Sequence, residues 1–229
     1  MVDERALTVL ITGASRGIGF ATAQAFLARG ARVAYCARDP GRLAESEREL
    51  AAFGEVWAQL ADVRTFDTVS EFVSAACERF GDIDVLINNA GVLCSGPFAQ
   101  EDPNSLAELI DVNVKGVLHM TRAVLPTMLA RGSGVVINIA SGAGLGGFAD
   151  LAAYCASKFA VVGFSESLDL EVTRQGVRVF ALCPGSTETE MLRQYSPAAR
   201  GMAPESVAER AVQLALHPSR YRVSCVTVP

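Results

Sequence analysis

The sequence lacks an apolar run long enough to cross a membrane, and it lacks the cysteine and histidine patterns of metal sites and disulfide frameworks. No apolar stretch among the 229 residues approaches the roughly 18 residues that a membrane-spanning helix needs. The six cysteines form no C-x-x-C pair and no cluster with histidine, so we expect reduced thiols and no metal. Residues 1–5 lack the basic and then apolar order of a signal peptide. These absences predict a cytoplasmic protein without a membrane partner.

Charge is also scarce. Charged residues make up 20% of the chain, the formal net charge is −5, and the arginines are scattered singly among acids, which argues against a nucleic-acid partner. Apolar residues make up 50%, and the predicted helices over 103–130 and 151–174 are apolar around much of their circumference. This pattern predicts subunit contacts, and we expect a homo-oligomer, a tetramer of D2 symmetry.

The chain begins its ordered pattern with an apolar run over 7–11 that breaks into a glycine-rich turn, Thr12-Gly13-Ala14-Ser15-Arg16-Gly17-Ile18-Gly19. Apolar residues then recur at helical spacing as far as Gly30, where a C-cap glycine is expected. A strand, a glycine turn and a helix N-terminus direct backbone N–H groups outward, which suits a phosphate or pyrophosphate. A plain strand-to-helix connection is the alternative for this motif alone.

Strand and helix patterns alternate along nearly the whole chain. We predict strands over 7–11, 32–36, 55–60, 84–87, 134–140, 177–182 and 222–228, and helices over 18–29, 41–52, 65–80, 103–130, 151–174 and 204–216. This alternation predicts one α/β domain over 1–229, a doubly wound Rossmann-type fold with a parallel sheet of about seven strands and helices on both faces. Ligands of such folds bind at the carboxyl ends of the strands. We place the substrate site in about 141–203, with 184–203 as a candidate lid.

A phenol and an ammonium group stand four residues apart at Tyr154 and Lys158, on one face of the predicted helix. Lys115 and Lys158 are the only lysines of the chain. A cation close to the phenol favours phenolate and lowers its pKa towards the working range of a general acid/base. Ser141 follows the fifth strand, where its hydroxyl could donate to a carbonyl oxygen held by Tyr154. An exposed Tyr and Lys on a solvated helix is the alternative for this pair taken alone.

The order and spacing of these motifs resemble the classical branch of the short-chain dehydrogenase/reductase family. The resemblance rests on the T-G-x-x-x-G-x-G turn, Asn88-Asn89-Ala90-Gly91, Ser141, the Y-x-x-x-K pair and Pro184-Gly185, and it covers 7–229. The chain departs from the family pattern at Cys183, where asparagine is usual, and at Gly142, where a β-branched residue or serine is usual. Neither departure removes a catalytic group.

The resemblance implies a role for each matching residue. Tyr154 would be the catalytic acid/base, Lys158 its partner that also binds the nicotinamide ribose, Ser141 the substrate-orienting hydroxyl, and Asn113 the support of a water relay to Lys158. A hydrogen bond inside the helix is the alternative for Asn113, and a helix cap is the alternative for Asp62, which would face the adenine. The cofactor-binding residues implied are Gly13, Ser15, Arg16, Gly17, Ile18, Gly19, Arg38, Asp62, Val63, Asn89, Ala90, Gly91, Tyr154, Lys158, Pro184, Gly185, Thr187 and Thr189.

The end of the second strand predicts NADPH as the cofactor. In this family an acidic residue there binds the ribose hydroxyls and selects NAD, whereas a neighbouring basic residue accepts the 2′-phosphate of NADP. Here Ala37 occupies the acidic position, Arg38 follows it, and Arg16 lies in the glycine turn. Asp39 is the main objection, but a capping role before Pro40 accounts for it.

The family resemblance says little about the substrate. Leu93, Phe148 and Met191, with Cys94 and Tyr195, are expected near the pocket and suggest a small apolar carbonyl compound. We therefore expect NADPH-dependent reduction of a ketone or aldehyde. An NAD-linked alcohol dehydrogenase of the same family is the alternative enzyme, and a dinucleotide-binding regulator without catalysis is the alternative outside enzymes.

Overall fold

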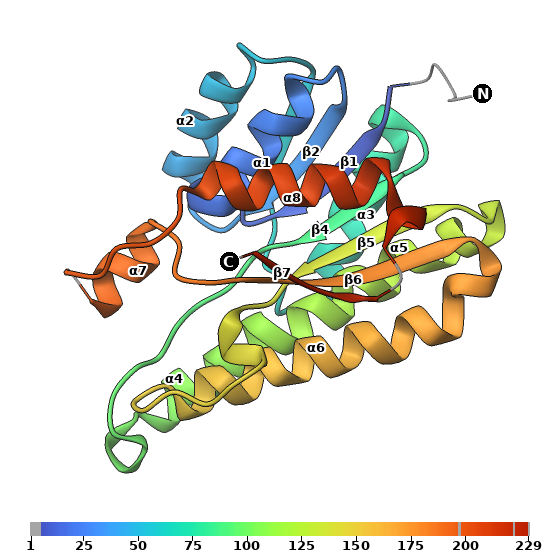
Figure 1. The fold of residues 1–229 in the computed structure, drawn as a ribbon. Coiled ribbons are helices and arrows are strands. Elements are labelled where there is room, and N and C mark those ends of the chain that lie inside the picture. Colours follow the sequence, from blue (N-terminus) through green and yellow to red (C-terminus); the bar gives the residue numbers. More distant parts are fainter. Residues whose placement is uncertain (1–5, 197, 222, 229) are drawn as a thin grey trace.

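The computed structural model describes residues 6–196, 198–221 and 223–228, which form an α/β fold around one sheet (Figure 1). All neighbouring strands run parallel, in the order β3-β2-β1-β4-β5-β6-β7. The strands are β1 (Thr8–Thr12), β2 (Arg32–Ala37), β3 (Val56–Leu60), β4 (Val85–Asn88), β5 (Gly134–Ile139), β6 (Val177–Pro184) and β7 (Cys225–Val228).

This strand order creates a switch point between β1 and β4. The chain starts in the middle of the sheet, builds outward to β3, and then returns to the other side of β1 to build β4 through β7. Because the connections leave β1 and β4 in opposite directions, a crevice opens between their carboxyl ends. Gly13 directly follows β1, and Asn89 directly follows β4.

Helices cover both faces of the sheet (Figure 1). They are α1 (Gly17–Leu27), α2 (Pro40–Leu50), α3 (Phe66–Phe80), α4 (Pro103–Ile110), α5 (Gly116–Arg131), α6 (Ala152–Val172), α7 (Glu190–Tyr195) and α8 (Pro204–Leu216). Phe26 of α1, Leu50 of α2 and Val207 of α8 are buried in one apolar cluster against the sheet. Phe72 of α3 and Val124 of α5 are buried in a second cluster, which also contains residues of α6. Two apolar layers therefore hold the sheet between them.

A chain of buried polar side chains ties β4 and β5 to α6 beneath the crevice. The Asn88 Nδ2 group donates to Asn138 Oδ1 at 2.8 Å, and Asn138 Nδ2 donates to Ser165 Oγ at 2.9 Å. Asn88 also donates to Thr121 Oγ1 of α5 at 3.1 Å. A buried amide without a hydrogen-bond partner destabilises the folded protein, so this network favours one relative position of the strands that carry the site.

The predicted fold class is confirmed, and the predicted alternation of strands and helices is found in the same order. The capping role expected of Asp39 is also present, since its Oδ1 accepts a hydrogen bond from the Arg42 backbone N–H at 3.0 Å. Pro40 occupies the first turn of α2, as expected.

The long helical region expected over 103–130 is found, since the backbone is helical without a gap over 103–131, but it contains a π-helical turn that the sequence patterns did not predict. Helix α4 ends at Ile110, a π-helical turn spans Asp111–Lys115, and α5 begins at Gly116. The Asn113 side chain in this turn makes hydrogen bonds to two other segments. Such turns occur inside α-helices and are frequent at functional sites. Gly30 ends helix α1 as expected. Its φ is 79°, its N–H donates to the Leu27 carbonyl oxygen at 2.9 Å, and the Ala31 N–H donates to the Phe26 carbonyl oxygen at 3.2 Å, which is the paired pattern of a Schellman C-cap.

Near the C-terminus, β7 covers Cys225–Val228 of the strand expected over 222–228. Arg222 lies outside the described residues, as do residues 1–5, on which the signal-peptide argument rests. The segment expected as a candidate lid contains α7, which the sequence patterns did not predict. None of the helices in the described ranges combines the length and apolar character required to span a bilayer.

Candidate active site

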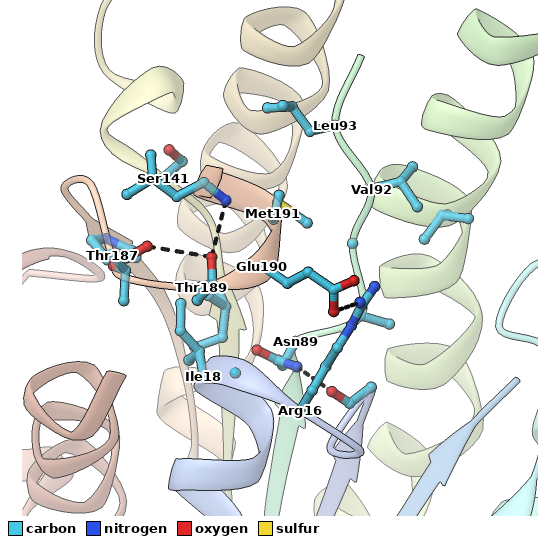
Figure 2. Close-up of a pocket in the computed structure, with 18 of the residues that line it drawn as sticks. Arg16, Ile18, Asn89, Val92, Leu93, Ser141, Thr187, Thr189, Glu190 and Met191 are labelled. Atoms are coloured by element: carbon cyan, nitrogen blue, oxygen red, sulfur yellow. Dashed lines mark hydrogen bonds and ion pairs between the residues drawn. The ribbon is translucent and has the colours of Figure 1, made fainter. Parts of the chain in front are cut away.

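A cavity of about 750 Å³ opens at the carboxyl ends of the strands (Figure 2). It extends from the turn after β1 and the end of β2, past the loop after β4, to Ser141, the first turns of α6 and the segment after β6. The predicted site residues line this cavity, with the exception of Gly19, Asp62, Asn113 and Cys94. The structure therefore brings together residues that are more than 100 positions apart in the chain.

The glycine turn brings backbone rather than side chains to the cavity. Gly13 and Gly17 have φ values of 68° and 58°, in the left-handed region that favours glycine. A Cβ on Gly13 would lie 2.9 Å from the Ala90 Cα, so the β1 turn packs directly on the loop after β4. Helix α1 starts at Gly17 with no side-chain cap and no acidic residue in its first turn. Its first N–H groups are therefore available to an anion.

Gly19, which its place in the motif predicted to bind the cofactor, packs instead against Asn89. It is buried outside the cavity, and a Cβ there would lie 2.4 Å from Asn89 Nδ2 and 2.5 Å from the Gly13 carbonyl oxygen. The Asn89 Nδ2 group donates to the carbonyl oxygens of Thr12 and Gly13 at 3.0 and 2.9 Å. Gly19 thus leaves room for the asparagine that ties the glycine turn to β4.

Thr12 completes this connection and was quoted in the motif without being predicted as a site residue. Its Oγ1 accepts hydrogen bonds from the backbone N–H groups of Asn89 and Ala90, each at 3.0 Å. Thr12 is buried at the end of β1, and its hydroxyl binds the backbone of the loop after β4 rather than facing the cavity. It is a positioning residue for the loop that lines the crevice.

Ser141, Tyr154 and Lys158 meet at the inner end of the cavity. Ser141 follows β5, and its Oγ accepts a hydrogen bond from the Ala143 N–H at 3.1 Å. Tyr154 and Lys158 lie one turn apart on α6, with the lysine Nζ 5.7 Å from the centroid of the tyrosine ring. The Lys158 Nζ donates to the Ile139 carbonyl oxygen of β5 at 2.9 Å. The triad is therefore anchored to the end of β5 from two sides.

Burial dominates the electrostatics of this group. Desolvation lowers the pKa of Lys158 from 10.5 to about 8. Desolvation also raises the pKa of Tyr154 above its ordinary value, and the hydrogen bond with Ser141 offsets only part of this effect. The lowering of the Tyr154 pKa expected from Lys158 is therefore not found in this structure, where burial has the largest effect on that pKa.

Asn113 does not reach the cavity. Its Oδ1 accepts from the Val92 N–H at 2.8 Å, and its Nδ2 donates to the Val92 carbonyl oxygen at 2.9 Å and to Ser157 Oγ at 3.1 Å. The side chain therefore clamps the loop after β4 to α6. These bonds reach two other segments, so they differ from the hydrogen bond inside the helix that was the alternative for Asn113, and the water relay stays a prediction. Gly91 separates it from the triad, since a Cβ there would lie 3.4 Å from Asn113 Oδ1 and 3.8 Å from Lys158 Nζ.

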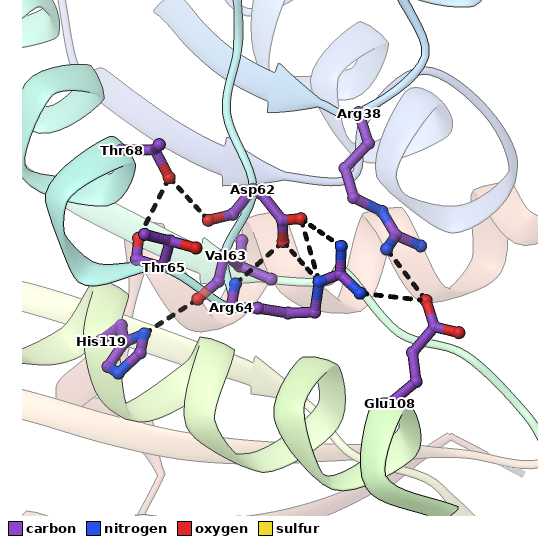
Figure 3. A network of polar contacts seen from close by, with 8 residues as sticks. All are labelled: Arg38, Asp62, Val63, Arg64, Thr65, Thr68, Glu108 and His119. Carbon is purple, nitrogen blue, oxygen red and sulfur yellow. Dashed lines mark hydrogen bonds and ion pairs between the residues drawn. The ribbon is translucent and has the colours of Figure 1, made fainter. Parts of the chain in front are cut away.

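Charged side chains form a network at the opposite end of the cavity (Figure 3). Arg64 lies between Asp62 and Glu108, with Nη atoms 2.6 Å from Asp62 Oδ2 and 3.5 Å from Glu108 Oε1. Arg38 approaches the same Glu108 oxygen at 3.0 Å. Partial burial raises the pKa of Asp62, but hydrogen bonds from Arg64 outweigh it and hold that pKa below its ordinary value. Asp62 is thus an ionised partner of Arg64, outside the cavity lining and not the N-cap of α3, which is Thr65.

The proposed substrate residues Leu93, Phe148 and Met191 line the cavity near the triad, and Tyr195 joins them from α7. Cys94 lies outside the lining, and its Sγ contacts the Ser105 carbonyl oxygen at 3.4 Å. Sequence reasoning missed further lining residues, including Arg42, Leu151, Glu190, Leu192 and Gln194. Only Arg42 carried a signal in the sequence, because it follows Arg38 by four positions at the start of a predicted helix.

Comparison with known proteins agrees with this architecture. The family model described as short chain dehydrogenase matches residues 7–200. The NADPH-dependent pterin aldehyde reductase of Arabidopsis thaliana is 36% identical over 215 residues, which cover 93% of this chain and 88% of that protein.

Two solved structures share the whole fold. A variant of actinorhodin polyketide ketoreductase, solved with NADPH, superposes with a TM-score of 0.93 at 33% identity, over 100% of this chain and 97% of that one. The 3-ketoacyl-(acyl-carrier-protein) reductase of Brucella melitensis, solved with NADH, superposes with a TM-score of 0.88 at 31% identity, over 97% and 96% of the two chains.

Proposed function

This chain belongs to the short-chain dehydrogenase/reductase family, and we propose that it is an NADPH-dependent carbonyl reductase acting on a ketone or aldehyde of a small apolar substrate. The observation that carries this proposal is the convergence of Ser141, Tyr154 and Lys158 with the glycine turn on one cavity. An anion-binding helix terminus at one end and a phenol beside a lysine at the other suit hydride transfer to a carbonyl.

The shape of the turn after β1 supports a dinucleotide. Glycines stand where a Cβ would meet the neighbouring backbone, and the uncapped start of α1 faces the cavity. We propose that Gly13, Ser15, Gly17 and Ile18 bind the pyrophosphate. The other residues proposed to contact the cofactor are Arg16, Arg38, Val63, Asn89, Ala90, Gly91, Tyr154, Lys158, Pro184, Gly185, Thr187 and Thr189. When bound, the nicotinamide cofactor supplies the hydride.

The chain supplies the proton and the orientation. In our proposal Ser141 and Tyr154 donate hydrogen bonds to the substrate carbonyl oxygen, and the Tyr154 hydroxyl proton passes to that oxygen as the alkoxide develops. Lys158 holds its charge beside the phenol while its Nζ remains bonded to the Ile139 carbonyl oxygen. The raised pKa of Tyr154 keeps the phenol protonated at neutral pH, which is the form that a general acid requires.

Arginines at the end of β2 support NADPH over NADH. Arg16 and Arg38 line the cavity, while the position of an NAD-selecting acid is occupied by Ala37. Asp39, which follows Arg38, accepts a hydrogen bond from the Arg42 backbone N–H through its carboxylate. A relative named as NADPH-dependent and a solved structure holding NADPH point the same way, although another solved structure holds NADH.

The substrate site is proposed to lie mainly in the C-terminal half of the domain, at about 141–203, with Leu93 added from the loop after β4. Phe148 is 55% exposed and Tyr195 is 39% exposed, so apolar area is available to a ligand in the cavity. An apolar ketone or aldehyde fits this lining. Ketoacyl and pterin aldehyde reductases among the similar proteins agree with carbonyl reduction as the reaction class.

The decisive experiment is a panel of ketones and aldehydes assayed with NADPH and with NADH. We expect faster oxidation of NADPH, and we expect Arg38→Ala to lower the NADPH to NADH ratio of kcat/KM by about tenfold or more. An unchanged ratio in Arg38→Ala would show that this arginine does not select the cofactor. Cofactor binding with no turnover on any carbonyl or alcohol would instead favour a regulator.

A further inference from the structure

Glu190, the first residue of α7, lies between two arginines that belong to the opposite wall of the cavity. Its carboxylate forms an ion pair with Arg16 of the glycine turn, 174 residues earlier in the chain (Figure 2). The same Oε2 atom lies 2.9 Å from Nη1 of Arg42, in the first turn of α2, and Oε1 lies 3.5 Å from Nη2 of Arg42. One carboxylate therefore joins three separate elements.

This carboxylate is an ionised group at any physiological pH. Hydrogen bonds from Arg42 and then from Arg16 lower the pKa of Glu190 to about 2. Two guanidinium groups that converge on one anion form a site that accepts either a carboxylate or a phosphate, because both anions present oxygens to the planar N–H donors. Glu190 occupies this site from within the chain.

The position of the two arginines identifies the competing anion. Arg16, Arg38 and Arg42 line the same wall of the cavity, next to the residues Cys36 and Ala37 at the end of β2. In a cofactor bound across the crevice, the adenosine ribose lies at this strand end. A phosphate ester on that ribose carries nearly two negative charges and would approach the guanidinium groups that Glu190 holds.

We propose that Glu190 is a cofactor-specificity residue whose carboxylate competes with the ribose 2′-phosphate of NADPH for Arg16 and Arg42, so that binding of NADPH, but not of NADH, releases α7. The inference rests on the proposed use of NADPH by this site. It adds Arg42 to the residues that receive the phosphate, and it assigns to α7 a part in selecting the cofactor.

The attachment of α7 makes this release possible. Two backbone hydrogen bonds join the ends of the segment that carries α7. The Glu188 N–H donates to the Met202 carbonyl oxygen, and the Met202 N–H donates to the Ser186 carbonyl oxygen, both at 2.9 Å. Between these ends, α7 has no buried residue, and in the described ranges its ion pairs are those of Glu190. Helix α7 is thus held to the α1 and α2 side mainly by polar contacts that an anion can exchange.

Release of α7 would reach the substrate. Met191, Leu192 and Tyr195 of α7 line the same cavity as Leu93 of the loop after β4. A phosphate at the adenosine end would therefore loosen one wall of the substrate pocket at the other end. The NADPH complex would therefore bind substrate more readily than the NADH complex, in addition to the affinity that NADPH gains from its contacts with the arginines.

The test is Glu190→Gln, which keeps the size of the side chain and removes its charge. We expect titration calorimetry to give NADPH binding about tenfold tighter than in the wild type, with NADH binding unchanged within about twofold. Glu188→Gln is the matched control, since Glu188 is exposed on the same segment and makes no ion pair with another described residue. Both dissociation constants should stay within about twofold in this control.

A second measurement uses fragments that lack the nicotinamide. Amide hydrogens of 190–195 should exchange faster in the presence of 2′,5′-ADP than in the presence of 5′-AMP, because only the former carries the competing phosphate. Equal exchange with the two fragments contradicts release of α7. An NADPH to NADH affinity ratio in Glu190→Gln equal to that of the wild type, or a lower one, overturns the competition.

These outcomes separate the two proposals. If the wild type binds both cofactors equally and Arg38→Ala does not alter that, the proposed NADPH preference fails. If the wild type prefers NADPH and Glu190→Gln leaves the ratio where it was, only the role of Glu190 fails.

Discussion

Replacement of Tyr154 by phenylalanine tests the catalytic proposal most directly. The change removes one hydroxyl group and keeps the ring, so the packing of α6 against the cavity wall stays in place. The hydroxyl makes a hydrogen bond with Ser141, and the Ser141 Oγ retains its bond from the Ala143 N–H in the variant. The perturbation is therefore confined to the group that we propose as the proton donor.

The expected effects on stability and on turnover differ greatly in size. Loss of one side-chain hydrogen bond lowers the free energy of unfolding by about 1 kcal/mol. Loss of a positioned general acid lowers kcat by roughly 10² to 10⁴-fold, which corresponds to about 3 to 5 kcal/mol of transition-state stabilisation. The glycine turn and the arginines are untouched, so the dissociation constant of NADPH should remain within about threefold.

The assay compares Tyr154→Phe with Tyr195→Phe on a substrate found in the carbonyl panel. Tyr195 lines the same cavity from α7, so its variant loses a phenolic hydroxyl from the same pocket without touching the triad. We expect Tyr195→Phe to keep kcat within about threefold of the wild type, although KM is free to change. Single-turnover measurements of NADPH oxidation would show that the chemical step, rather than product release, has slowed in Tyr154→Phe.

Two results would refute the reasoning. Wild-type kcat in Tyr154→Phe would remove the phenol from the mechanism, even though the fold and the cofactor site would stand. An equal loss of kcat in both tyrosine variants would show that hydroxyl groups in this pocket act generally on substrate binding or solvation. The proposed role of Tyr154 as the proton donor would then be contradicted.

Three further predictions concern the fold that supports the site. Folding lowers the pKa of Lys158 from 10.5 to about 8, so the unfolded chain holds more protons between these values and the Lys158 contribution to stability rises with pH across that window. Chemical denaturation should show the wild type gaining about 3 kcal/mol relative to Lys158→Met between pH 7.5 and 10.5, and parallel curves would contradict the burial of this charge. Gly13→Ala should lower the free energy of unfolding by about 2 to 4 kcal/mol, because φ at this position is 68° and the new Cβ would meet Ala90. Gly163→Ala is the control, and it should be neutral or slightly stabilising because no atom lies close to the new Cβ. Light scattering should give the mass of an oligomer at micromolar concentration, and Phe159→Glu on the exposed side of α6 should shift that mass towards the monomer. A wild type with the mass of a monomer would contradict the predicted subunit contacts.

The sequence patterns were sufficient for the fold because each element carries its own local signal. The strands are continuous apolar runs, and the turn after β1 is encoded by glycines that the backbone requires at Gly13 and Gly17. Asp39 and Pro40 mark the start of α2 by capping chemistry that depends on neighbouring residues alone. Signals of this kind are readable without knowledge of the tertiary structure.

The features that the sequence patterns did not predict depend instead on contacts between distant segments. The π-helical turn between α4 and α5 contains Asn113, whose hydrogen bonds reach Val92 and Ser157 in two distant segments. The pKa of Tyr154 was expected to follow the charge of Lys158, but it follows burial, which depends on everything packed around α6. Both features arise from contacts between distant segments, which residue spacing does not report.

The same distinction separates the two halves of the candidate site. The proposed catalytic half is held by buried groups, since Lys158 is 6% exposed and its Nζ donates to the backbone of β5. Substitutions there are therefore expected to disturb the core as well as the chemistry. The cofactor-selecting half consists of exposed ion pairs, in which the side chains of Arg16, Arg42 and Glu190 are 52%, 45% and 43% exposed. Such pairs contribute only about 0 to 1 kcal/mol each to folding, so substitutions among them leave the fold intact. We therefore expect single charge changes at this end of the cavity to alter cofactor preference, whereas we expect no other side chain to replace Tyr154, the proposed proton donor at the other end.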